Sequence, residues 1–251
     1  MGWHALIGAL ILRLLFPRAS PARRRALAGW WAGKVLRILG VAVRVEGDPP
    51  APGAGAVIAA NHISWLDIFA VQAVHPTRFV AKSEIRDWPV AGWIAEHAGT
   101  LFIRRSLRSD TARINELVHS ALAQGDCVGI FPEGTTTEGD TLLKFHSSLF
   151  EPAVANAARV HPCAIRYQHA DGSPCRAIAY VGELSFMQSL GLTIRQRDVV
   201  ASVRFAPAID AGTLSRREVA AAAHEHVATL LGLPAADKAP RSASGRPAAP
   251  P

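Results

Sequence analysis

The residues best suited to chemistry in this sequence are His62 and Asp67, in the stretch NHISWLDIF at 61–69. Neutral imidazole titrates near neutral pH, so His62 can act as a general base. An aspartate bonded to the other ring nitrogen fixes the imidazole tautomer and stabilises the imidazolium that forms. The pair therefore predicts proton removal from a hydroxyl group. A His and an Asp that only cap a turn are the alternative that these two residues leave open.

A strand, a turn and a helix are the elements expected around this pair. A short apolar run, residues 56–60, comes before it, and apolar residues continue at helical spacing over 66–74. A separation of five residues within one helix would place the two side chains about 140° apart around its axis. His62 and Asp67 can therefore face one site only if His62 precedes the helix, at the end of the strand.

Strand-like and helical patterns alternate from Gly40 onward, which predicts an α/β fold with a mostly parallel mixed sheet flanked by helices. The expected strands are 41–45, 56–60, 78–81, 101–103, 127–131, 160–167, 177–181 and 199–205. The other expected helices are 85–97, 110–124, 148–158 and 215–231, and the last opens with a Ser215-x-x-Glu218 capping box.

Four expected strands end in polar groups: His62, Lys82, Arg105 and Glu133. In open α/β sheets, binding sites collect at the carboxyl ends of the strands. A base, two cations and a Gly-containing turn at one edge indicate a single anion-binding site. Considered one at a time, each group has a simpler explanation. Lys82 and Arg105 could be solvated cations, and Pro132-Glu133-Gly134 could form an ordinary turn.

Length and composition favour one domain with additional segments. The chain has 251 residues, 49% of them hydrophobic, which is enough for a sizeable core. The formal net charge of +7 favours an anionic partner, either a membrane surface or a nucleic acid. Cys127, Cys163 and Cys175 show no CxxC spacing, so neither a metal site nor a disulfide framework is predicted, and a reducing, cytosol-facing body fits.

The two ends of the chain differ from the α/β part. Apolar stretches at 3–16 and 27–45 flank a basic run at 17–25. Fourteen helical residues span about 21 Å, less than the hydrocarbon core of about 30 Å, so the first stretch is not expected to cross a bilayer alone. Tryptophans and basic residues beside apolar helices favour anionic lipid on the cytoplasmic side. We predict membrane-associated helices over 1–43, with ordinary core helices as the alternative, and a disordered tail over 235–251.

Four ordered blocks of sequence resemble those of the 1-acylglycerol-3-phosphate acyltransferase family of phospholipid and glycerol acyltransferases. The blocks are NHISWLD at 61–67, GTLFIRR at 99–105, FPEGT at 131–135 and VHPCAIRY at 160–167. The resemblance makes 44–234 the glycerolipid acyltransferase domain and implies that His62 and Asp67 are catalytic. It also implies a set of substrate-binding residues: Lys82, Arg105, Phe131, Pro132, Glu133, Gly134 and Thr135.

The reaction implied by this resemblance is direct acyl transfer without a covalent enzyme intermediate. The donor would be the thioester of acyl-CoA or acyl carrier protein, a co-substrate, so no cofactor is expected. The acceptor would be the free hydroxyl of a lysolipid, with 1-acylglycerol-3-phosphate predicted first, giving phosphatidic acid in phospholipid biosynthesis. Backbone N–H groups near Gly134 are candidate oxyanion donors. We expect the enzyme to contact membrane lipids at the cytoplasmic face of the cell (inner) membrane.

Residue 136 departs from the family pattern. The family usually continues with Arg after Phe-Pro-Glu-Gly-Thr, whereas this chain has Thr136. An Arg there would offer a two-pronged contact to phosphate. The continuation TTTEGDTLLKFHSSLFEPAV at 135–154 resembles the branch that includes lyso-ornithine-lipid acyltransferases. A lyso-ornithine lipid is therefore the alternative acceptor.

Two other classes of function fit the sequence less well. A serine hydrolase would need a G-x-S-x-G elbow, which does not occur, and Ser64 is too close to His62 in sequence. A non-enzymatic basic protein that binds membranes would explain the charge but not the ordered blocks. The aromatic interleaving of a nucleic-acid surface is also missing, so no nucleic-acid partner is expected.

Overall fold

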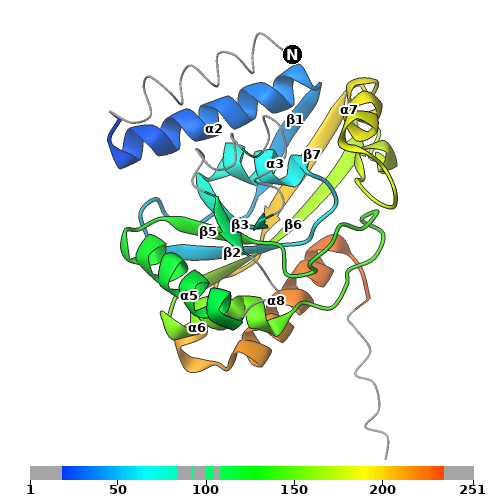
Figure 1. The fold of residues 1–251 in the computed structure, drawn as a ribbon. Coiled ribbons are helices and arrows are strands. Elements are labelled where there is room, and N and C mark those ends of the chain that lie inside the picture. The colour runs from blue at the N-terminus through cyan, green and yellow to red at the C-terminus, as the bar shows by residue number, and fades with distance from the viewer. Residues whose placement is uncertain (1–18, 84–91, 93–99, 104–107, 235–251) are drawn as a thin grey trace, which may run out of the picture.

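The structure, a computed structural model, describes residues 19–83, 92, 100–103 and 108–234. Within these residues the chain forms an eight-stranded sheet with helices on both faces (Figure 1). The strand order is β1-β7-β6-β2-β5-β3-β4, and β8 pairs with β6. The strands are β1 Val41–Glu46, β2 Ala56–Ala60, β3 Thr77–Lys82, β4 Leu101–Ile103, β5 Cys127–Ile130, β6 Arg159–His169, β7 Val199–Phe205 and β8 Ile209–Asp210.

The helices form two layers. They are α2 Pro21–Ile38, α3 Leu66–Val74, α5 Arg108–Ala123, α6 Glu151–Ala155, α7 Phe186–Ile194 and α8 Arg216–Leu231. Helices α2 and α3 cover one face of the sheet, while α5, α6 and α8 cover the other (Figure 1). Successive side chains of β2 point to opposite faces of the sheet. Ile58 packs into the core beneath α2 and α3, and Val57 into the core beneath α5, α6 and α8. A strand buried on both faces reads as an unbroken apolar run, as residues 56–60 do.

The directions of the strands bring the predicted site residues to one edge. Strands β2, β5, β3 and β4 are neighbours and run parallel, so their carboxyl ends meet at one edge of the sheet. Strand β6 is parallel to β2, whereas β6 and β7 are antiparallel. The predicted α/β fold with a mostly parallel mixed sheet is thereby confirmed.

Several predicted elements differ from the structure. The expected strand at 177–181 is wrong, because the chain there forms a short 3-10 turn, Arg176–Ile178, and the Tyr180 N–H then bonds to the Ile63 carbonyl. The expected helix at 148–158 is two short pieces, Ser147–Phe150 and α6, because Pro152 starts a new helix. Helix α7 was not predicted. Most of the expected helix at 85–97 and the tail at 235–251 lie outside the described residues.

Helix α2 is part of the domain rather than a separate segment. It ends at Ile38, and β1 enters the sheet at Val41, within the segment expected to be membrane-associated. Its inner face buries Ala32 and Leu36, while Trp30 on its outer face is 50% exposed. A search of the described residues finds no helix that is both long and apolar enough to span a bilayer. The first predicted apolar stretch, 3–16, lies outside the described residues.

Candidate active site

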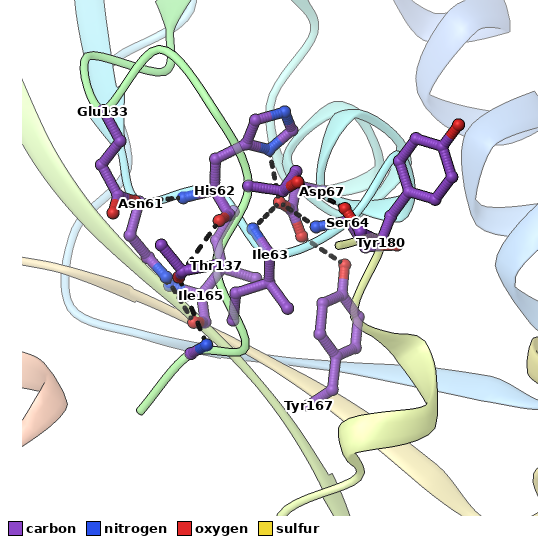
Figure 2. Close-up of polar contacts among 12 residues, drawn as sticks. Asn61, His62, Ile63, Ser64, Asp67, Glu133, Thr137, Ile165, Tyr167 and Tyr180 are labelled. Carbon is purple, nitrogen blue, oxygen red and sulfur yellow. Dashed lines mark hydrogen bonds and ion pairs between the residues drawn. The ribbon is translucent and has the colours of Figure 1, made fainter. Parts of the chain in front are cut away.

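The His62 and Asp67 side chains meet at the carboxyl end of β2. Asn61 to Trp65 form the turn between β2 and α3, so His62 precedes the helix and Asp67 lies in its first turn, as the spacing predicted. His62 Nδ1 is 2.8 Å from Asp67 Oδ2 (Figure 2). Because a carboxylate accepts at Nδ1, this nitrogen carries the proton and Nε2 is the basic one. The His62 side chain is 20% exposed, whereas that of Asp67 is fully buried.

Three further hydrogen bonds hold the Asp67 carboxylate. The backbone N–H groups of Ile63 and Ser64 donate to Oδ2 at 2.7 and 2.9 Å, and the Tyr167 hydroxyl donates to Oδ1 at 2.8 Å. Figure 2 shows Tyr167 rising from β6 toward Asp67. Burial, together with the negative charge of Asp67, raises the pKa of Tyr167 well above its ordinary value, so this residue stays a proton donor. These donors fix the orientation of the carboxylate toward the imidazole of His62.

Glu133 holds the backbone of His62 instead of facing solvent. The His62 N–H donates to Glu133 Oε1 at 2.7 Å, and the Leu143 N–H donates to Oε2 at 2.9 Å. Only 3% of Glu133 is exposed. Burial raises the pKa of Glu133, and these two N–H groups act in the opposite direction. The carboxylate predicted to bind the lysolipid head group is thus engaged by the protein itself.

Asn61 extends the pairing of β2 and β6 beyond the end of β2. Its side-chain amide accepts from the Ile165 N–H at 2.7 Å and donates to the Ile165 carbonyl at 3.1 Å. Asn61 is 1% exposed, so both bonds are made away from water. The amide takes the place of a backbone peptide, which frees the main chain to turn toward His62.

The segment after the Phe-Pro-Glu-Gly-Thr block closes the site from one side. The Thr137 N–H donates to the His62 carbonyl at 2.9 Å. The Thr136 hydroxyl donates to the Tyr180 carbonyl, and the Tyr180 N–H donates to the Ile63 carbonyl at 2.9 Å. Thr136 therefore joins the 176–182 segment to the His62 turn.

A stack of aromatic rings supports the imidazole. The Phe131 ring lies 4.0 Å from the His62 ring, centroid to centroid, at an angle of 12°. Phe79 lies behind it, 5.4 Å from the Phe131 ring and nearly parallel. Phe131 thus contacts the proposed base with its face, a contact that favours an apolar environment for the imidazole.

The other predicted substrate-binding residues lie around this edge or outside the described residues. Pro132 is buried, and Gly134 adopts φ +76° in a turn in which its N–H donates to the Phe131 carbonyl at 3.1 Å. The Gly134 N–H, a candidate oxyanion donor, is therefore already engaged, whereas Thr135 is exposed. Lys82 is the last residue of β3 and pairs with Ile103 of β4. Arg105 lies outside the described residues.

Several residues that build the site were not predicted from the sequence. They are Phe79, Thr137, Leu143 and Tyr167, together with Asn61 in its bridging role. Asn61 and Tyr167 lie inside the recognised blocks at 61–67 and 160–167, and Thr137 lies just after the block at 131–135, which is the signal that could have drawn attention to them.

The site contains no group suited to hold a metal among the described residues. Nowhere in that part of the chain do three or more His, Cys, Asp or Glu side chains cluster in a way that could bind an ion. Cys127, Cys163 and Cys175 are buried free thiols. Burial raises the pKa of Cys127 to about 12, which keeps it a thiol. The arrangement at His62 is therefore that of a base with an orienting carboxylate.

Comparison with known proteins places this geometry in a family. Residues 42–166 match the Acyltransferase family. The chain is 38% identical over 212 residues to the lyso-ornithine lipid O-acyltransferase of Pseudomonas aeruginosa, covering 84% of this chain and 80% of that protein. It is 42% identical over 151 residues to the 1-acyl-sn-glycerol-3-phosphate acyltransferase of Neisseria meningitidis, covering 60% of this chain and 59% of that protein.

A solved structure supports the fold. The crystal structure of the 1-acyl-sn-glycerophosphate acyltransferase of Thermotoga maritima superposes with a TM-score of 0.65 and covers 92% of each chain at 20% identity. The two chains therefore share the α/β architecture around the sheet. With a family match that spans the His62 turn and a relative 38% identical over most of its length, the chain belongs to the acyltransferase family.

Proposed function

We propose that this protein is a lysolipid O-acyltransferase whose acceptor is a lyso-ornithine lipid. The observation that carries the proposal is the extent of the similarity to the Pseudomonas aeruginosa lyso-ornithine lipid O-acyltransferase, which covers 84% of this chain. The order of the two acceptors predicted from the sequence is thus reversed. The acyl donor is the thioester of acyl-CoA or acyl carrier protein.

The chemistry assigned to His62 is proton removal from the acceptor hydroxyl. His62 Nε2 takes the proton, the oxygen attacks the thioester carbonyl, the C–S bond breaks, and the thiolate leaves with a proton returned by the imidazolium. Asp67, fixed by Ile63, Ser64 and Tyr167, stabilises the imidazolium between these two proton transfers. No side chain needs to be acylated.

The contacts of Thr136 support an acceptor without a phosphate monoester. Its hydroxyl is used in the bond to the Tyr180 carbonyl, so this position provides neither a cation nor a free donor. A phosphate monoester gains most from a two-pronged Arg contact, which this position lacks. A lyso-ornithine head group bears a carboxylate and an amine instead, and depends less on such a cation.

The second acceptor is 1-acylglycerol-3-phosphate. It is favoured by the 42% identity to the Neisseria meningitidis enzyme, a higher identity than the 38% shared with the Pseudomonas aeruginosa protein, although over a shorter length. Lys82 ends β3 at the edge where Glu133 and His62 lie, and a cation at that edge would suit a phosphate group.

The deciding experiment is a comparison of acceptors with the purified full-length protein. Lyso-ornithine lipid and lysophosphatidic acid are presented in the same detergent micelles. Each is tested with acyl-CoA and with acylated acyl carrier protein as donor, and the products are measured by mass spectrometry. We expect kcat/KM for lyso-ornithine lipid to be at least about tenfold higher, a difference of about 1.4 kcal/mol in transition-state stabilisation. Equal or better use of lysophosphatidic acid would overturn the proposed acceptor and leave the roles of His62 and Asp67 unchanged.

A pair of variants at one position sharpens the result. Thr136→Arg adds the missing cation, and Thr136→Ser keeps the hydroxyl that donates to Tyr180. We expect Thr136→Arg to improve lysophosphatidic acid relative to lyso-ornithine lipid, while Thr136→Ser leaves the ratio of the two rates unchanged. A ratio that Thr136→Arg leaves unchanged, or that shifts equally in both variants, would show that a cation at this position does not set the preference.

We also propose that the enzyme works at the cytoplasmic face of the cell (inner) membrane. The support is the net charge of +7, the basic run at 17–25 and the apolar stretch at 3–16. Fractionation of cells that produce the full chain, with protease access from each side, tests this location.

A further inference from the structure

Helix α7 buries two polar side chains and exposes two large apolar ones. Its buried positions include Ser189 and Thr193, both 0% exposed. Its outward positions include Met187, which is 70% exposed, and Ile194, which is 50% exposed. A helix on a water-soluble domain normally buries its apolar side and exposes its polar one.

The exposed apolar residues of α7 share one side of the helix. Met187 and Ile194 are seven residues apart, which places them about 20° from each other around the axis. Gly191 lies on the same side and leaves open space, since no atom lies within 4 Å of where its Cβ would be. The result is a shallow apolar strip along α7 that is not covered by any described residue.

The buried side of α7 contacts the turn that carries His62. Trp65 Nε1 donates to Ser189 Oγ at 3.0 Å, and the Trp65 ring meets the Phe186 ring edge-on at 5.1 Å. Trp65 belongs to the turn that carries His62 and the residues donating to Asp67. The inner side of α7 thus contacts the active-site turn through Ser189 and Phe186.

Basic residues and the end of α2 adjoin this strip. Arg195 and Arg197 follow α7 directly and are exposed. A Cβ added at Gly40, between α2 and β1, would lie 3.6 Å from the Gln196 carbonyl oxygen, so the ends of α2 and α7 are neighbours. Ile38, at the end of α2, is 45% exposed. Exposed apolar side chains next to arginines match the region between acyl chains and anionic headgroups of a membrane.

We propose that the outer side of α7, together with the adjoining end of α2, is a lipid-contact surface that rests on an anionic membrane. In this position α7 lies between the bilayer and the Trp65 turn, so Ser189 and Phe186 connect the membrane contact to the turn that carries His62. The inference goes beyond the proposed function, because it holds for either acceptor. It also gives the membrane contact a place within the described domain, beyond the N-terminal segment.

A probe placed on α7 tests the proposal in the full-length protein. Met187→Cys is labelled with the environment-sensitive dye NBD; Cys127, Cys163 and Cys175 are buried, which limits labelling elsewhere. The matched control is Leu117→Cys on α5, on the opposite face of the sheet and 37% exposed. Vesicles of phosphatidylethanolamine with phosphatidylglycerol, with and without spin-labelled lipid, are then added.

The expected result is a blue-shifted, brighter NBD emission at position 187 that spin-labelled lipid quenches, and neither change at position 117. An unchanged emission at 187 would overturn the proposal. A shift at 187 that depends on protein concentration without vesicles would also overturn it, since the strip would then contact a second copy of the chain.

A functional readout separates the surface from the chemistry. The double variant Met187→Gln with Ile194→Gln is expected to raise KM for a vesicle-borne acceptor by roughly tenfold, while kcat/KM for the same acceptor in detergent micelles stays within about twofold. A folded variant with equal losses in vesicles and micelles would show that α7 acts only through Trp65. Failure of the proposed acceptor would leave this comparison intact, since either lysolipid serves.

Discussion

His62 is restrained through both its ring and its backbone. Asp67 bonds to Nδ1, Phe131 covers one ring face, Glu133 takes the backbone N–H, and Thr137 donates to the carbonyl. A proton-transfer group restrained in this way needs little reorganisation when the acceptor hydroxyl arrives. The effect of a substitution here should therefore appear in the rate, and much less in the fold.

Replacing the proposed base gives the first prediction. We expect His62→Ala to lower kcat by at least about 10² to 10⁴, because proton removal from the acceptor is lost. Asp67→Asn should be similarly severe, since an amide can present an N–H to Nδ1 and favour the wrong tautomer. The measurement is acyl transfer in micelles, with circular dichroism as the control for folding. Turnover of His62→Ala near the wild-type level would contradict the assignment.

Tyr167 offers a subtler test, because it touches Asp67 and not the imidazole. In Tyr167→Phe the Oδ1 atom loses its donor at 2.8 Å, so more negative charge is available to the imidazolium. We expect the acidic limb of the kcat/KM profile to move to higher pH, with the plateau lowered only about two- to tenfold.

A matched control is Tyr180→Phe, whose backbone, not its ring, makes the contacts seen at the site. It should leave the pH profile in place. If Tyr167→Phe lowers the plateau without moving the limb, its hydroxyl only supports packing.

The residues that could be predicted are those whose relation is local in the sequence. His62 and Asp67 are five residues apart, so their meeting follows from one strand, one turn and one helix. Tyr167 and Asp67 are one hundred positions apart, and their contact depends on how β6 lies beside β2. No local pattern contains that information. Glu133 was predicted as a substrate-binding residue from the family resemblance, and only the two N–H donors explain why this charged group is buried instead.

At the scale of elements, Gly129 of β5 leaves space for side chains of the neighbouring strand β3. A Cβ on Gly129 would lie 2.6 Å from the Phe79 ring and 2.8 Å from Thr77 Cγ2. Phe79 stacks on Phe131, and Phe131 stacks on His62. Gly129 therefore allows strand β3 to approach β5 closely enough for the aromatic stack to form.

Gly129→Ala should disturb both stability and rate. We expect the free energy of unfolding to fall by about 1 to 3 kcal/mol, as for other overpacked cores, and kcat/KM to fall as Phe131 shifts. Gly191→Ala on α7 is the control, because its Cβ would meet no atom within 4 Å. Denaturant unfolding and the micelle assay measure the two effects. A Gly129→Ala protein as stable as wild type would show that Phe79 moves aside without cost.

Strands and helices were predicted correctly where the apolar residues of the sequence are the buried ones, and wrongly where they are not. Strands β2, β4 and β7 were placed with their observed bounds because each is an apolar run between turn residues. Helix α7 was missed because two of its buried residues, Ser189 and Thr193, are polar while the apolar Met187 and Ile194 are exposed, so periodicity and burial disagree. The apolar run at 177–181 was misassigned because its backbone bonds to the His62 turn and not to a neighbouring strand.

At the scale of the whole molecule, the buried His75 and the half-buried His161 link stability to pH. Burial lowers the pKa of His75 and of His161 from the ordinary value of 6.5. The unfolded chain therefore takes up protons at these positions before the folded one does, and stability falls as the pH drops below 6.5 toward the folded pKa.

The prediction is that His75→Gln flattens this dependence. Urea unfolding of wild type and variant at about pH 7.5 and about pH 5.5 gives the change in unfolding free energy over the window in which the unfolded histidine titrates. We expect a smaller loss on acidification in the variant. An identical loss in both proteins would show that His75 is accessible to protons in the folded state.

The position of β1 at the edge of the sheet bears on how the chain is made. Strand β1 is the first to leave the ribosome, yet among the described strands it pairs with β7 alone, from Val41 opposite Val199 to Glu46 opposite Arg204. At about 5 to 20 residues per second, the wait for β7 is on the order of ten to thirty seconds. Throughout that interval the backbone N–H and C=O groups of β1 are unpaired and can hydrogen-bond to a non-native strand. Nascent chains are therefore most prone to mispair at β1, and a membrane or chaperone that shelters the emerging α2–β1 segment would act before any catalytic residue is in place.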